Sequence, residues 1–422
     1  MNIAGTIPKS EDRSILKRKG TLLGGILLTC GSSIGVGILP LPILTGKAGS
    51  LPTVLIFLAC GLYMTLTALL ILETALQSTR TANFTTLARS SLNKVGQSAV
   101  FFSFLFLFYS LTTAYLAKGG ELTHRILESF LPFSLPVWSG AVFLALLSGS
   151  FIILGPILVD YLNRIFFLGL LATYLMLAIS GIKHFEMKNV VHADWSLSIY
   201  IIPFIISSFG WHNMIPSINT FLENDRKKST KTILISAVVL FLIYVVWVVG
   251  LHGILPLEGG LSLADSFDKG EIVTEPLARM MNNPMIQYTA LYMAFFAIIT
   301  SMLGQGLSVV DFLSDALRLD KTTKIRILLC LALLLPTLFC SQFIPGIFFK
   351  ALELGGGVAA MIVFGIIPAC MCWVNRYKKD QATQIPPLVF GGKPMLIVII
   401  LLASFVISYE MLKNFFSLDL IH

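Results

Sequence analysis

Long apolar stretches follow one another along almost the whole chain and leave little room for any other kind of domain. A helix that crosses the hydrocarbon core of a bilayer needs about 20 predominantly apolar residues. We predict eleven such helices over residues 21–44, 51–76, 98–117, 137–154, 157–182, 197–221, 233–255, 285–316, 327–343, 355–374 and 395–412. The connecting segments are too short to fold separately, so we expect any function to lie among the helices.

The composition indicates that lipid, rather than water, surrounds this chain. Of its 422 residues, 56% are hydrophobic and 12% are charged, whereas soluble domains carry about 25% charged residues. These values argue against a soluble enzyme, a disordered chain and a nucleic-acid-binding protein. The sequence also lacks a nucleotide-binding P-loop and a His-Glu-x-x-His motif, so we expect neither enzymatic activity nor ATP-driven transport.

Lys and Arg residues gather on alternate sides of the predicted helices. With a cytoplasmic N-terminus, most of the 30 Lys and Arg residues fall in cytoplasmic segments, including residues 1–20, 226–231 and 318–326. Cytoplasmic loops of membrane proteins carry such an excess of positive charge. The alternation therefore predicts a cytoplasmic N-terminal segment over residues 1–20, a multi-pass protein and a C-terminus on the opposite side of the membrane.

Two of the predicted helices contain helix-weakening residues near the middle of the membrane. The first reads Gly31-Ser32-Ser33-Ile34-Gly35-Val36-Gly37 and is followed by Pro40 and Pro42. The sixth reads Ser207-Ser208-Phe209-Gly210-Trp211-His212-Asn213 and lies between Pro203 and Pro216. In a helix interior Gly costs about 1 kcal/mol and Pro about 3 kcal/mol relative to Ala. We expect both helices to be interrupted, because unwound backbone at membrane depth is tolerated where it lines a cavity.

The two interruptions open two sets of five helices, which we assign to a first repeat over residues 21–182 and a second over residues 197–374. One further helix follows at 395–412. Interrupted helices at matching positions of two halves point to the binding site of a transporter. Their free N–H groups and carbonyl oxygens would suit the carboxylate and the ammonium of an α-amino acid. Close packing of neighbouring helices on Gly and Ser is the alternative explanation.

At these residues the chain resembles the hydroxy/aromatic amino acid permease family, and the similarity extends over nearly the whole sequence. The matching stretches are residues 31–37, 108–115, 159–164, 207–218 and 300–315. The resemblance implies an all-α integral membrane protein with a LeuT-type inverted five-plus-five helix repeat and an eleventh transmembrane helix. It also implies a bacterial inner-membrane symporter that imports an aromatic amino acid, with tyrosine as the first candidate, together with H⁺ or Na⁺.

Two alternatives to tyrosine symport remain open. In the first, the substrate is another amino acid, namely tryptophan, phenylalanine or serine. In the second, the protein is a channel or a receptor. In either case we expect a monomer in the lipid bilayer, with a cytoplasmic N-terminus and a periplasmic C-terminus, that has no cofactor and no nucleic-acid partner.

The resemblance assigns substrate-binding roles at both interruptions. The backbone cradle of the fold corresponds here to Ser32, Ser33, Gly35, Gly37, Ser207, Ser208, Phe209 and Gly210. Tyr109 is expected beside the substrate carboxylate. The candidates for an aromatic pocket are Phe209, Trp211, Tyr292 and Phe296. His212 is a further candidate, because an ionisable residue within a membrane span is a functional hypothesis by default. An ordinary structural role is the alternative for each of these residues.

The coupling ion has two candidate arrangements. Sodium-coupled relatives of the fold hold Na⁺ between the first and eighth helices, and the matching residues here are Gly31, Ile34, Ala297, Thr300 and Ser301. Oxygen ligands at such a crossing suit a small hard cation. Some proton-coupled relatives carry a basic residue on the fifth helix, whereas this chain is apolar there around Leu171.

Other charged residues lie near the predicted ends of the helices. Asp160 and Arg164 are four residues apart and are expected to pair on one helix face. Together with Glu73 they are interpreted as gate or structural contacts. Lys118 and Glu121 are expected to pair at the outer end of the third helix.

Overall fold

The computed structural model describes residues 20–77, 84–320, 322–378 and 385–415, and it leaves the side chains of Ser32 and Val36 undescribed. The predicted N-terminal segment therefore lies outside the described residues, apart from Gly20. The elements in chain order are α1 (Leu22–Ile34), η1 (Val36–Ile38), α2 (Leu41–Gly46), α3 (Ser50–Leu76), α4 (Phe84–Phe130), α5 (Trp138–Leu154), α6 (Pro156–Gly181), η2 (Ile182–His184), α7 (Met187–Val190), η3 (Trp195–Leu197), α8 (Ile202–Ser208), η4 (His212–Met214), α9 (Ile215–Phe221), α10 (Arg226–Ile254), α11 (Leu263–Asp268), α12 (Thr274–Met281), α13 (Pro284–Leu317), α14 (Thr323–Phe343), α15 (Ile347–Leu354), η5 (Gly355–Ile366), α16 (Ile367–Tyr377) and α17 (Gly392–Phe415).

The long helices agree with the apolar stretches of the sequence. Within the described residues, eight helices are long and apolar enough to cross a membrane, and α1 and α5 are shorter apolar helices. The predicted third helix extends well beyond residues 98–117, because α4 runs from Phe84 to Phe130 with a break at Asn93 (φ 63°, ψ −164°). The predicted tenth helix also begins earlier, at Ile347, and contains a π-helix over Gly355–Ile366.

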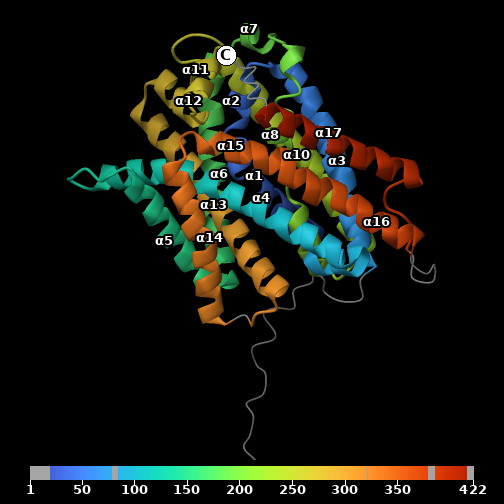
Figure 1. Ribbon diagram of the computed structural model, residues 1–422. Coiled ribbons are helices and arrows are strands. Elements are labelled where there is room, and N and C mark those ends of the chain that lie inside the picture. Colours follow the sequence, from blue (N-terminus) through green and yellow to red (C-terminus); the bar gives the residue numbers. More distant parts are fainter. Residues whose placement is uncertain (1–19, 78–83, 321, 379–384, 416–422) are drawn as a thin grey trace, which may run out of the picture.

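The helices form one bundle around a small set of inner elements. In Figure 1, α2, α7, α11 and α12 gather at one end of the bundle, which we call the α12 end. The second half of the chain packs onto the first, since α13 lies against α6 and α4, and α10 lies against α1 and α3. Near the end of the chain, α17 packs against η5.

Large apolar side chains cover the outer faces of the peripheral helices. Leu168 on α6 is 64% exposed, Phe339 on α14 is 62% exposed and Leu401 on α17 is 62% exposed. A water-soluble monomer rarely exposes apolar patches of this extent. The outer surface of the bundle is therefore suited to contact with lipid.

Candidate functional site

The first predicted interruption is present in the structure. The helix α1 ends at Ile34, Gly35 takes a non-helical conformation (φ −40°, ψ −117°), and the chain continues through η1 into the short helix α2. A Cβ atom at Gly35 would lie 1.6 Å from Ser301 Oγ on α13, so α13 fills the space that a side chain would need. Glycine is therefore required where the chain turns beside α13.

The second predicted interruption is also present. The helix α8 ends at Ser208, residues 209–211 are not helical, and the chain resumes through η4 into α9. A Cβ atom at Gly37 would lie 2.9 Å from Ser208 Oγ. The two interruptions therefore face each other at close range, which confirms the pairing that their glycines and serines predict.

One side chain connects the two interruptions. The Tyr244 hydroxyl on α10 lies 2.8 Å from the Ser33 carbonyl oxygen and 2.9 Å from the Ser208 carbonyl oxygen. One turn further along α10, Trp247 Nε1 donates a hydrogen bond of 2.8 Å to the Ile38 carbonyl oxygen. Neither role could be predicted from the sequence, because both residues lie in a uniformly apolar stretch with other aromatic residues.

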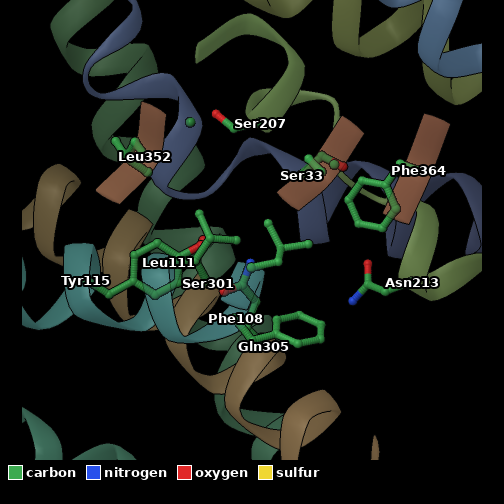
Figure 2. A pocket seen from close by; sticks show the side chains of 14 residues that line it. Ser33, Phe108, Leu111, Tyr115, Ser207, Asn213, Ser301, Gln305, Leu352 and Phe364 are labelled. Carbon is green, nitrogen blue, oxygen red and sulfur yellow. The ribbon is translucent and has the colours of Figure 1, made fainter. Parts of the chain in front are cut away.

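A narrow cavity lies between the two interruptions (Figure 2). It is lined by Ser33, Gly37, Leu107, Phe108, Leu111, Tyr115, Ser207, Gly210, Asn213, Ser301, Gln305, Leu352, Ala360 and Phe364. Its volume is about 40 Å³, which has room for a few water molecules. Side chains around it must move apart before it can hold an aromatic amino acid.

The cavity contains four of the predicted backbone-cradle residues, Ser33, Gly37, Ser207 and Gly210. The others lie close behind them. Gly35 packs against α13, and the Ser208 hydroxyl donates a hydrogen bond of 2.9 Å to the Phe204 carbonyl oxygen. Ser32 lies on α1, and its side chain is outside the described part of the structure. The role of each residue in substrate binding stays a prediction.

Tyr115 of α4 lines the cavity, whereas the predicted Tyr109 does not. The Tyr109 hydroxyl donates a hydrogen bond of 2.7 Å to the Ala332 carbonyl oxygen on α14. Phe108, Leu111 and Tyr115 line the cavity instead. Tyr115 lines the cavity together with Ser301 and Gln305 of α13. With Leu107 the three lining residues of α4 form one face of this helix, but their helical spacing does not show which face of α4 meets the cavity.

The predicted aromatic candidates pack around the site rather than along the cavity wall. Phe209 is buried edge-on against Phe57, with ring centres 6.3 Å apart. Trp211 is only 1% exposed. Tyr292 and Phe296 stack on each other on the side of α13 that faces α6. Phe108, Tyr115 and Phe364 are the aromatic residues that line the cavity.

His212 lies one side chain away from the cavity. It is wholly buried, and its ring stacks on Phe364 with centres 4.6 Å apart. Its Nε2 lies 2.9 Å from Thr67 Oγ1 on α3, and its Nδ1 has no hydrogen-bond partner among the described residues. His212 therefore supports the back of Phe364, and any direct role in transport stays a prediction.

The residues predicted to bind sodium are only partly brought together. Ser301 and the Ala297 carbonyl oxygen lie against the turn at Gly35, next to Ile34. The Thr300 hydroxyl is bonded within its own helix, 2.8 Å from the Phe296 carbonyl oxygen and 3.0 Å from that of Ala297. Within the described residues, there is no group of three or more His, Cys, Asp or Glu side chains that could hold a metal ion.

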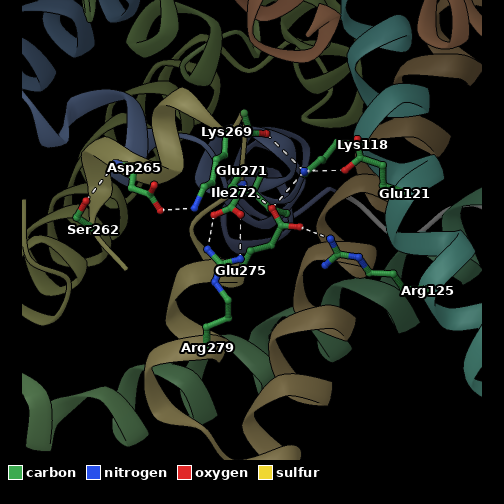
Figure 3. Close-up of polar contacts among 11 residues, drawn as sticks. Lys118, Glu121, Arg125, Ser262, Asp265, Lys269, Glu271, Ile272, Glu275 and Arg279 are labelled. Carbon is green, nitrogen blue, oxygen red and sulfur yellow. Dashed lines mark hydrogen bonds and ion pairs between the residues drawn. The ribbon is translucent and has the colours of Figure 1, made fainter. Parts of the chain in front are cut away.

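Ionic contacts join α4 to α12 at the α12 end of the bundle (Figure 3). Lys118 Nζ lies 2.8 Å from Glu121 Oε2, as predicted, and 3.2 Å from Glu275 Oε2. The other oxygen of Glu275 lies 2.9 Å from an Arg125 nitrogen. Lys118 is three residues beyond Tyr115, about one helical turn along α4. These contacts therefore hold the α12 segment in place one turn away from the cavity.

A second ion pair in the same region is exposed to solvent. Both Arg279 terminal nitrogens bind the Glu271 carboxylate, with the Nη1–Oε1 distance at 2.9 Å. Burial alone would raise the pKa of Glu271, but the hydrogen bonds and the charge of Arg279 outweigh burial and lower this pKa below its ordinary value. Glu271 is therefore held in its charged form beside α12.

At the opposite end of the bundle, Glu73 on α3 pairs with Arg376 on α16. The Arg376 Nε lies 2.6 Å from Glu73 Oε1, and an Arg376 terminal nitrogen lies 2.7 Å from Oε2. The Leu388 N–H donates a further hydrogen bond of 2.8 Å to Oε2. The predicted pair of Asp160 and Arg164 is confirmed at 2.8 Å.

Comparison with known proteins identifies the family of this chain. The model of the tryptophan/tyrosine permease family matches residues 18–410. The tyrosine-specific transport system 1 of Haemophilus influenzae is 28% identical, over 92% of this chain and 95% of that protein. The tryptophan-specific transport protein of the same organism is 28% identical, over 92% of this chain and 94% of that protein.

A solved structure shares the fold. The crystal structure of MhsT in complex with L-phenylalanine has a TM-score of 0.61 and 14% sequence identity, covering 94% of this chain and 99% of that chain. This likeness confirms the predicted all-α LeuT-type fold. The matched relatives are named as transport proteins rather than enzymes, and with the apolar helices they indicate a multi-pass membrane protein. The chain belongs to the tryptophan/tyrosine permease family.

Proposed function

We propose that this protein is a secondary active symporter that imports an aromatic amino acid, tyrosine before tryptophan, together with a cation. It works in the bacterial inner membrane as a monomer, with its N-terminus in the cytoplasm. The observation that carries the proposal is the meeting of two interrupted helices around one cavity, where Gly37 approaches Ser208. Paired interruptions of this kind mark the substrate sites of transporters.

The chemistry of the cavity suits a zwitterion with an aromatic side chain. Among the described residues, those that line the cavity include no charged side chain. Backbone groups at the interruptions must therefore meet the charged ends of the substrate. The Ser33 and Ser208 carbonyl oxygens each contact the Tyr244 hydroxyl, and each keeps a second lone pair that suits an ammonium group. Phe108 and Phe364 offer apolar faces to an aromatic ring.

Alternating access explains how so narrow a cavity passes a substrate of this size. The α4–α12 contacts hold the α12 end together one turn from Tyr115. Separation of these elements would widen the cavity toward that end, and a corresponding separation at the other end would release the substrate. A ligand shifts such an equilibrium by its different affinities for the two states.

Transport by purified protein in liposomes tests the proposal. We expect uptake of labelled tyrosine to respond to a proton or a sodium gradient, and preloaded tyrosine to accelerate exchange. A channel would show no such exchange, and the absence of any gradient response would exclude symport. Competition by unlabelled tryptophan, phenylalanine and serine ranks the substrates, and preferred transport of serine would contradict an aromatic carrier.

A comparison of two glycine variants tests where the substrate site lies. In the Gly37→Ala variant the added methyl group would crowd Ser208 at the meeting point of the two interruptions. We expect loss of at least ten-fold in tyrosine exchange, because the backbone around the substrate is displaced. Gly304→Ala on α13 is the matched control, since a Cβ atom there has no neighbour within 4 Å. Equal exchange by the two folded variants would contradict the assignment of the site.

A further inference from the structure

A second buried polar cluster lies outside the cavity, where α17 packs against η5 and an ion pair joins α17 to α15 (α15 and α17 are labelled in Figure 1). It contains Glu353 on α15 with Glu410 and Lys413 on α17, and we call it the Glu410 cluster. The Lys413 ammonium pairs with Glu353 and lies 3.6 Å from Glu410 Oε1. It also lies 5.3 Å from the ring centre of Tyr200, which precedes α8. Tyr409 packs edge-on against Tyr200 and completes the surroundings.

The charges of the Glu410 cluster do not balance. Two carboxyl groups face one ammonium group, and the titratable groups around them are only the tyrosines Tyr200 and Tyr409 among the described neighbours. Glu410 has no exposed surface, and neither of its carboxylate oxygens has a hydrogen-bond partner among the described residues. A buried carboxylate that lacks a partner is costly.

Glu353 and Glu410 both lie beside the Lys413 ammonium, so their carboxyl groups are close neighbours. One ammonium group can balance only one carboxylate, and two carboxylates have only acceptor oxygens, so neither can satisfy the other unless one of them carries a proton. Two carboxyl groups that are close neighbours in a buried site disfavour each other's ionisation, and they can hold one proton in common. With that proton, the charges of Glu353, Glu410 and Lys413 sum to zero.

The Glu410 cluster is joined to the walls of the cavity. A Cβ atom at Gly357 in η5 would lie 2.5 Å from Glu410 Cγ and 3.1 Å from Pro203 Cβ, so η5 packs closely against both Glu410 and the start of α8. Leu352, next to Glu353, lines the cavity. Loss of the proton would leave one unbalanced negative charge in this packed contact. The charge would favour separation of α17 from η5 and entry of water.

We propose that the Glu410 cluster is a proton-binding site at which Glu410 and Glu353 share one exchangeable proton, and that this proton is the coupling ion of transport. The second part rests on the proposed function. The proton binds in one orientation of the transporter, neutralises the cluster and lets α17, η5 and α8 pack together. Its release in the other orientation separates the same elements, which include walls of the cavity.

The test compares Glu410→Gln with the wild-type protein and with Glu258→Gln, which changes an exposed glutamate between α10 and α11. Gln has the shape of a protonated Glu but cannot release a proton. We expect Glu410→Gln to lose all acceleration of tyrosine uptake by a proton gradient while keeping exchange of preloaded tyrosine. Glu258→Gln keeps both. Glu353→Gln serves as the second variant if Glu410→Gln does not fold.

Infrared difference spectroscopy during alkaline titration gives a readout that does not depend on transport. The wild-type protein should show a protonated-carboxyl band that disappears as the pH rises, and Glu410→Gln should lack this change. Persistence of the band change or of proton-driven uptake in Glu410→Gln would overturn the proposal. Wild-type uptake that responds only to sodium would overturn the coupling role. Failure of the wild type to carry any aromatic amino acid would refute the proposed function, and the infrared result alone would then decide the proton site.

Discussion

Two buried ionic clusters in this protein contain the same kinds of groups but differ in how these groups are satisfied. At Glu73, one carboxylate meets one guanidinium, and both of its oxygens accept hydrogen bonds. At Glu410, two carboxyl groups share one ammonium, and neither Glu410 oxygen has a hydrogen-bond partner among the described residues. The Glu73 pair is balanced in charge and its oxygens are bonded, whereas the Glu410 cluster has one negative charge in excess unless a proton binds. The Glu73 pair is therefore suited to a structural role, and the Glu410 cluster is suited to proton exchange.

The largest loss of stability is expected when the ion pair of Glu73 and Arg376 is broken. Arg376→Ala leaves the buried Glu73 carboxylate without its partner, and removal of one member of a buried pair costs about 3–5 kcal/mol. Unfolding of the purified variant in detergent measures the loss. Arg164→Ala is the control, because the Arg164 side chain is 74% exposed and such pairs contribute at most about 1 kcal/mol. Equal stability of the two variants would remove the structural role of the Glu73 pair.

A smaller loss of stability is expected on removal of the Tyr244 hydroxyl, because the groups that it contacts are uncharged carbonyl oxygens. Tyr244→Phe removes the hydroxyl that lies between the Ser33 and Ser208 carbonyl oxygens. Leaving a buried polar group unsatisfied costs about 1–3 kcal/mol. Tyr161→Phe is the matched control, since Tyr161 is 63% exposed on α6. Thermal unfolding in detergent compares the two variants, and an unchanged midpoint for Tyr244→Phe would show that the hydroxyl does not stabilise the interruptions.

The smallest change in stability is expected at the Glu410 cluster. Glu410→Gln replaces a protonated acid with a neutral group of similar size, so we expect a change in stability of less than about 1 kcal/mol. The same unfolding measurement at neutral pH checks this value against that of Arg376→Ala. A loss as large as that of Arg376→Ala would mean that Glu410 is ionised and paired, and the contrast between the two clusters would disappear.

The sequence predicts the helices and their interruptions because both depend on local composition. Apolar stretches set the spans, and Gly, Ser and Pro in residues 31–37 and 207–213 weaken helices wherever those helices pack. The neighbours of each side chain depend instead on how a helix is rotated and on what packs beside it. The sequence could not show that Tyr115, rather than Tyr109, faces the cavity, that Glu275 joins Lys118, or that Glu353 meets Glu410.

The presence of the π-helix could not be predicted from the sequence either. Residues 355–366 are apolar and rich in glycine, and this pattern fits an ordinary buried helix as well as a π-helix. The three consecutive glycines at 355–357 permit the contacts with α8 and Glu410 that surround this segment. Such a contact between distant parts of the chain is a property of packing, which no local pattern reports.

The Tyr244 hydroxyl on α10 contacts both interruptions. Since one hydroxyl touches the ends of both α1 and α8, neither can swing outward alone without giving up that contact. The hydroxyl thus links the two half-helices, and we expect the cavity walls that they form to move together. In the carrier that we propose, opening would therefore require α1 and α8 to tilt together, because α10 is joined to both.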